Sequence, residues 1–227
     1  MIGVVVGGAS RSVGDELSKS QALVDLLRQL GGTEGVVEAY LASTLGVFGL
    51  LAAAYTISAV LRMRAEEEAQ RTEAVLATSV SRLGYSGSHL AFAAIGPAMM
   101  LAVGGALTGL VYGAATGDVG GQTGRLLLAG LVQVPAVWVV TGLALALFGL
   151  LPRLTVAAWA VLAGTVLISF VAPVLRWDQW TLDLSPFTHV PRYPSRAITA
   201  LPLVSLTAIA VVLSLLGLAG FRRRDIG

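Results

Sequence analysis

Five segments of this chain contain no charged residue, and each is long enough to cross a lipid bilayer. They are Ala39–Leu61, Leu90–Gly113, Leu126–Leu150, Leu154–Leu175 and Leu201–Phe221. Crossing the hydrocarbon core takes about 20 apolar residues, and a backbone surrounded by lipid must satisfy its own hydrogen bonds by forming a helix. The pattern therefore predicts an all-α, polytopic membrane protein with five transmembrane helices.

The composition supports this class. Hydrophobic residues make up 56% of the 227 residues and charged residues 12%, whereas a soluble domain has about 25% charged residues. So few charges could not cover the surface of a water-soluble fold of this size. The net charge of +2 is too small to indicate nucleic-acid binding. The absence of cysteine excludes disulfides, thiolate metal sites and a cysteine nucleophile.

Three longer polar segments flank the spans, at residues 9–38, 62–89 and 176–200, and we expect residues 1–227 to form a single transmembrane domain. Ile2 to Gly8 is apolar but too short to span a bilayer. A signal peptide has a basic residue before its apolar run. None precedes this run, so it does not match a signal peptide. We therefore expect this run to be the stub of a helix.

Arginines indicate the orientation of the chain. Arg62 and Arg64 directly follow the first span, and Arg222–Arg224 follow the last. Basic residues next to helix ends favour the cytoplasmic side. We expect residues 62–89 and the C-terminus to be cytoplasmic, and residues 9–38, 114–125 and 176–200 to be outside.

The sequence offers no energy source for transport within this chain. Proton- and sodium-driven pumps usually carry ionisable residues inside the membrane, and the five predicted spans have none. The chain has one lysine, Lys19, which does not belong to a G-x-x-x-x-G-K-[ST] phosphate loop. Uphill transport would therefore depend on a partner that supplies the energy.

The segment 62–89 is longer than a bare connection between two helices needs. Up to about Ala77 it is rich in good helix formers, and Glu67 and Arg71 form an i,i+4 pair. Two interpretations are open: a solvated loop helix, or a helix that docks on a partner at the membrane surface.

Residues 66–82 (EEEAQRTEAVLATSVSR), which lead through Ser88-His89-Leu90 into the second span, resemble the cytoplasmic loop of ABC exporter permeases, the type-2 ABC membrane subunits. The resemblance is to polyketide-antibiotic exporters of the tetronasin-resistance type. Residues 185–191 (SPFTHVP) and 220–227 (GFRRRDIG) resemble the late external loop and the C-terminus of that family. The chain resembles the second half of such permeases. Most of the first helix of that half has no counterpart in it. We therefore expect a fragment, a truncated gene product or one half of a split permease.

This resemblance implies a function, a location and partners. The chain would be the membrane half of an exporter in the bacterial cell membrane, moving a hydrophobic or amphiphilic compound such as an antibiotic, a polyketide or a lipid. A separate ATPase subunit would bind ATP and magnesium, and a second permease half would complete the path. The implied ATPase-coupling residues are Glu66, Glu67, Glu68, Arg71, Glu73 and Arg82. The implied external gate consists of Ser185, Pro186, Phe187, His189 and Pro191.

Residues 176–200 are predicted to fold back at the outer membrane surface. Trp177 and Trp180 have amphipathic rings that prefer the headgroup zone, and several prolines restrict the segment to short helical pieces and turns. In the resembling family this position holds short re-entrant helices. The alternative is a loop pinned by the two tryptophans.

Other motifs leave alternatives open. Gly84-Tyr85-Ser86-Gly87 is typical of intramembrane serine proteases, but its histidine base would be His189, predicted a bilayer away. A non-transporting membrane scaffold is a further alternative. We predict no catalytic and no metal-binding residue, and we assign no substrate-binding residue.

Two patterns within the spans concern helix packing. Gly105, Gly109 and Gly113 have the G-x-x-x-G spacing of a helix interface, although this spacing can arise by chance among 27 glycines. Pro97 and Pro135 lie inside predicted spans and are expected to kink them.

Overall fold

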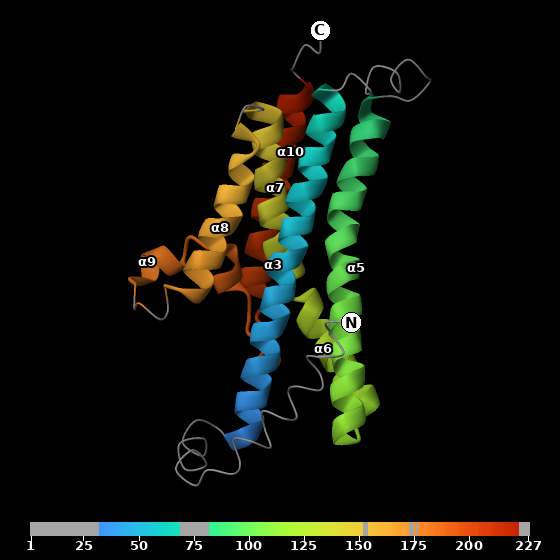
Figure 1. Cartoon of the computed structure of the whole chain (residues 1–227), viewed down its shortest axis with the longest axis vertical. Helices are drawn as coiled ribbons and strands as arrows, with labels where there is room; N and C mark the ends of the chain where they lie inside the picture. Colours follow the sequence, from blue (N-terminus) through green and yellow to red (C-terminus); the bar gives the residue numbers. More distant parts are fainter. Residues whose placement is uncertain (1–31, 69–81, 152–153, 173–174, 176, 223–227) are drawn as a thin grey trace. The chain divides into compact units, whose positions relative to one another are not determined.

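The computed structural model describes residues 32–68, 82–151, 154–172, 175 and 177–222 (Figure 1). Every regular element within these ranges is helical, as the sequence predicts. The elements are α3 (Gly32–Glu68), α5 (Arg82–Thr116), α6 (Val119–Leu131), α7 (Val134–Leu150), α8 (Ala157–Phe170), α9 (Gln179–Leu182), the 3-10 helix η2 (Pro186–His189) and α10 (Ala200–Arg222). The predicted helix stub at Ile2 to Gly8 lies outside the described residues.

Four helical stretches are long and apolar enough to cross a membrane, which confirms a polytopic membrane protein. They are Gly35–Arg62, Ala94–Thr116, Val119–Leu150 and Ala200–Phe221. The predicted count of five is not confirmed, because the fourth predicted span contains α8, a helix of 14 residues. Such a helix is about 21 Å long, which is shorter than a hydrocarbon core of about 30 Å.

The helices also extend into segments that the sequence predicts to be loops. α3 begins at Gly32 and ends at Glu68, so it includes residues from both flanking polar segments. Of the segment 114–125, which joins the second and third predicted spans, only Gly117 and Asp118 lie outside a helix. Gly117 has a φ of +84°, and the Asp118 carboxylate accepts a hydrogen bond of 3.0 Å from the Gly121 backbone N–H. This cap starts α6 well before the first apolar residues of the predicted span.

The chain forms two compact units. Unit 1 comprises Met1–Gly49, Met99–Val134 and Val190–Ala200, and unit 2 comprises Leu50–Ala98, Pro135–His189 and Leu201–Gly227. α3 and α5 each contribute residues to both units. That residues 1–227 act as a single transmembrane domain stays a prediction.

In unit 1, the glycine row of α5 packs against α6, which favours the helix-interface interpretation of the G-x-x-x-G spacing over chance. A Cβ atom added at Gly109 would lie 2.6 Å from the Cα atom of Thr123, and one added at Gly113 would lie 2.7 Å from the Cα atom of Val119. Only glycine lets the two backbones approach this closely.

Between α6 and α7 the helical path breaks at Val132 and Gln133. Pro135 has no N–H to donate to the Leu131 carbonyl. Just before it, the Gln133 N–H donates to the Gly130 carbonyl at 3.1 Å, three residues back, and so departs from the α-helical spacing of four. The distortion predicted for Pro135 is therefore confirmed.

In unit 2, α7 and α10 run side by side in the same direction. A Cβ atom added at Gly142 would lie 2.9 Å from the Ala210 carbonyl oxygen, and one added at Gly149 would overlap the Gly217 carbonyl oxygen. The rings of Phe148 and Phe221 stack with centroids 5.6 Å apart. Because the two helices are parallel, the chain between Leu150 and Ala200 must return along their length, and α8 lies on this return path despite its shortness.

We expect Gly149→Ala to destabilise the protein, because the new methyl group would force α7 and α10 apart. Over-packing of this kind typically costs about 1–3 kcal/mol of unfolding free energy. Gly164→Ala in α8 is the matched control, since a Cβ atom there meets nothing within 4 Å. Thermal unfolding in detergent should show a lower Tm for Gly149→Ala only. Equal Tm values would mean that the close approach of α7 and α10 is wrong.

Candidate functional site

A cluster of polar side chains joins three segments of unit 1 that lie far apart in the sequence. The Arg125 guanidinium in α6 donates to the Glu38 carboxylate in α3, forming an ion pair. Arg125 also interacts with the side chain of Tyr193, from the segment Val190–Ala200. The side chains are 36% exposed for Arg125 and 27% exposed for Glu38. An ion pair inside segments otherwise suited to lipid marks a functional site by default.

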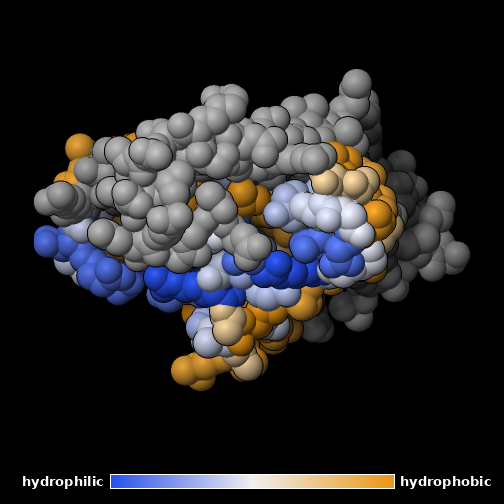
Figure 2. Space-filling view, turned by 90° about the horizontal axis from the view of Figure 1, so that it is seen from below, coloured by the Kyte–Doolittle hydropathy of each residue, from blue (hydrophilic) through white to orange (hydrophobic). Residues whose placement is uncertain are grey.

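Both charged residues lie in the first turns of their helices. α6 also carries Asp118 and Gln122 at this end. Figure 2 views the molecule from the end where α3 and α6 begin, and its described surface shows a strip of hydrophilic residues bordered by hydrophobic ones. In the sequence, the ion pair lies close to other polar residues of α3 and α6, near the boundary of the apolar stretches.

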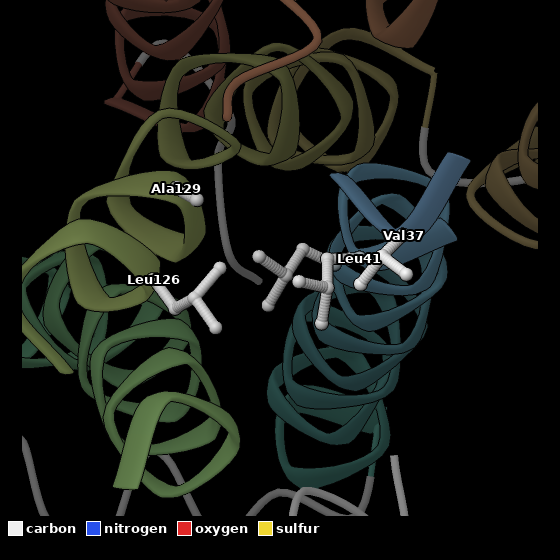
Figure 3. Packing of buried hydrophobic residues seen from close by; sticks show 5 residues of the cluster. Val37, Leu41, Leu126 and Ala129 are labelled. Carbon is white, nitrogen blue, oxygen red and sulfur yellow. The ribbon is translucent and has the colours of Figure 1, made fainter. Parts of the chain in front are cut away.

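Apolar side chains next to the ion pair hold α3 and α6 together. Figure 3 shows Val37 and Leu41 of α3 facing Leu126 and Ala129 of α6. Leu126 and Leu41 are almost fully buried. Val37 precedes Glu38 and Leu126 follows Arg125, so the packing brings the two charges together. The Tyr193 side chain packs against the same cluster.

The predicted external gate is a compact turn against α8. Ser185 is 1% exposed, and its hydroxyl lies 3.3 Å from the Ser169 hydroxyl of α8. The Thr188 hydroxyl donates to the Leu182 carbonyl at 2.7 Å. His189 Nδ1 lies 3.1 Å from the Ser185 carbonyl oxygen, a contact in which the Nδ1–H tautomer is the donor.

Around this turn, both α9 and η2 contact α8. Pro186 and Phe187 are half-buried within η2, while Pro191 follows in the segment Val190–Ala200. Trp180 of α9 is 67% exposed, as a headgroup anchor would be. Residues 177–199 thus consist of short helical pieces and turns, as predicted. Its location outside the membrane stays a prediction.

The predicted ATPase-coupling residues are only partly within the described residues. Glu66, Glu67 and Glu68 are the last residues of α3, and Arg82 is the first residue of α5. Arg71 and Glu73 lie outside the described residues. The backbone therefore brings the described coupling residues to the ends of two long helices, and their role stays a prediction.

The described residues give few options for chemistry. No group of three or more His, Asp or Glu side chains among them could hold a metal ion. Ser86 lies in the first turns of α5, while the ring of His189 contacts the Ser185 backbone. No observation here favours the serine protease alternative.

Sequence reasoning missed the Glu38–Arg125 pair. The predicted spans begin at Ala39 and Leu126, so the two charges fall just outside them and look like ordinary boundary residues. A usable signal did exist. Both charges directly precede an apolar segment on the same predicted side of the membrane, and they have opposite signs.

Comparisons with known proteins match the whole chain. The family model described as "Multidrug efflux system permease Rv1217c, C-terminal domain" matches residues 1–222. A curated relative, the multidrug efflux system permease protein Rv1217c of Mycobacterium tuberculosis (strain ATCC 25618 / H37Rv), is 39% identical over 226 residues. The alignment covers 100% of this chain and 41% of that relative. This chain therefore spans less than half the length of the relative.

We predict measurable coupling between Glu38 and Arg125. In a double-mutant cycle of Glu38→Gln, Arg125→Gln and the double variant, the coupling energy should be about 1 kcal/mol, at the upper end for partly exposed pairs. Unfolding by denaturant in detergent measures it. A parallel cycle of Glu38 with the exposed Arg192 should give no coupling. Additive effects of Glu38→Gln and Arg125→Gln would contradict the ion pair.

Proposed function

Since the chain belongs to the family defined by the C-terminal domain of the multidrug efflux system permease Rv1217c, we propose that it is the transmembrane half of an ATP-driven ABC exporter. The observation that carries this proposal is the family match over residues 1–222 of a multi-span helical protein. The remaining permease half would come from a second protein segment, and ATP and magnesium would bind to a separate ATPase subunit.

The exported compound is proposed to be hydrophobic or amphiphilic. The relative is named as a multidrug efflux permease. Within the four apolar stretches, the described charged residues apart from the terminal Arg62 are Glu38 and Arg125, which neutralise each other. An export path between these helices would offer a substrate dispersion contacts and hydroxyl groups, but no net charge for recognising an ion.

The coupling to ATP hydrolysis is proposed to run through residues 62–89. α3 continues without a break from the apolar stretch to Glu68, over 37 residues in all. A continuous helix of that length is about 55 Å long, well beyond the thickness of the hydrocarbon core. A push on Glu66–Glu68 from an ATPase subunit would therefore move the membrane-spanning part of α3 as a rigid lever.

The external end of the path is proposed to be closed by α9 and η2. These short helices contact α8, and Ser185, between them, lies 3.3 Å from Ser169 of α8. Opening of the gate is proposed to break this contact. The polar turn would lie at the outer surface of a bacterial cell membrane, with the C-terminus in the cytoplasm.

Charge reversal at Glu73 tests the coupling role. Removing one partner of a buried charge pair costs about 2–5 kcal/mol, so Glu73→Lys should weaken ATPase binding at least about tenfold and abolish export. The amount of protein in the membrane should stay the same. Asp178→Lys, at the opposite predicted side and without a side-chain cap hydrogen bond, is the control and should leave ATPase binding unchanged. Normal ATPase binding by Glu73→Lys would favour a solvated loop.

The orientation can be tested with single cysteines, because the chain has none of its own. A cysteine at Ser79 should react only with reagents that reach the cytoplasm. A cysteine at Asp183, an exposed residue next to α9, should react with membrane-impermeant reagents from outside. The opposite labelling pattern would refute the cytoplasmic placement of residues 62–89.

A further inference from the structure

The segment Val190–Ala200 is held in unit 1 although the residues just before it belong to unit 2. Val190 is 6% exposed and Pro194 is buried, whereas Arg192, Ser195 and Arg196 are exposed. A short segment without regular structure has few backbone hydrogen bonds of its own. Side chains must therefore fix its position.

Tyr193 and Arg125 supply that fixation together. The tyrosine side chain packs against the apolar cluster of α3 and α6 and also reaches the Arg125 guanidinium. A guanidinium has five N–H donors in a planar fork. One of them binds Glu38, and the fork has further donors for a second acceptor. Arg125 is thus the common partner of α3 and of the segment Val190–Ala200.

We propose that Arg125 is the positioning residue of the external gate. Its ion pair with Glu38 sets the direction of the guanidinium, and the guanidinium holds Tyr193 and with it the segment Val190–Ala200. Val190 directly follows His189, the last residue of η2, so the anchored segment is joined through the chain to one end of the predicted gate. The inference rests on the proposed function for its role in export. The anchoring itself can be measured without transport.

Anchoring is tested by the reactivity of a cysteine at Val190. In membranes that contain Val190→Cys, a small membrane-permeant maleimide should react slowly, because the side chain is buried. Adding Arg125→Gln should raise the labelling rate about fivefold, since a buried thiol reacts in proportion to the population of the opened segment. Ser195→Cys, in the same segment but exposed, should react fast in every background.

Variants of Glu38 and Tyr193, the two partners of Arg125, distinguish loss of the anchor from a general loss of folding. Glu38→Gln and Tyr193→Phe, which loses only the hydroxyl, should each raise the labelling rate of the Val190 cysteine, even if Arg125→Gln fails to accumulate. Arg192→Gln removes an exposed charge from the same segment and should change nothing.

Slow labelling of the Val190 cysteine in all of the Arg125→Gln, Glu38→Gln and Tyr193→Phe backgrounds would overturn the anchoring, and so would fast labelling in the Arg192→Gln control. Because the reagent crosses the membrane, the labelling rate of the Val190 cysteine reports on the anchor in either orientation of the chain. Export is then measured in the same variants. Fast labelling with normal export would refute the role in gating while leaving the anchor and the proposed exporter function intact.

Discussion

Lipid offers no hydrogen-bond partner, and this constraint shapes every described element. Backbone groups must be satisfied within helices, and charges must be paired or placed at helix ends. The chain meets the first demand with long helices and the second with the Glu38–Arg125 pair. Without a hydrophobic drive between helices, close packing must hold them together. Glycine rows in α5, α7 and α10 provide that contact.

Charge-free segments predict the class of fold well, because lipid permits only one backbone solution for them. The same argument fails at helix ends. A residue such as Glu38 or Arg125 can extend a helix beyond the apolar run when a partner neutralises it, and that partner lies 87 positions away. The predicted fourth span also fails at its ends, because α8 covers only Ala157–Phe170 of it. The following short helices α9 and η2 pack against α8 and do not extend it.

Some residues of the candidate sites could be named from the sequence, and others could not. Ser185 and His189 were named from a family resemblance, and the structure gives them a shared turn against α8. The coupling residues depend on a partner protein, so neither the chain nor its fold can test them. Arg125 and Tyr193 could not be found from spacing, because Tyr193 contacts a helix from another part of the chain. Opposite charges beside two apolar segments were the only signal in the sequence.

The central claim is that this chain serves as one membrane half of an ATP-driven exporter. Its most direct test is reconstitution in inside-out proteoliposomes with an ATPase subunit and the complementary permease half. A hydrophobic fluorescent dye should accumulate inside the vesicles when ATP and magnesium are added. Omitting this chain, or blocking ATP hydrolysis, should abolish the accumulation. Equal accumulation without the chain or without ATP would contradict the account.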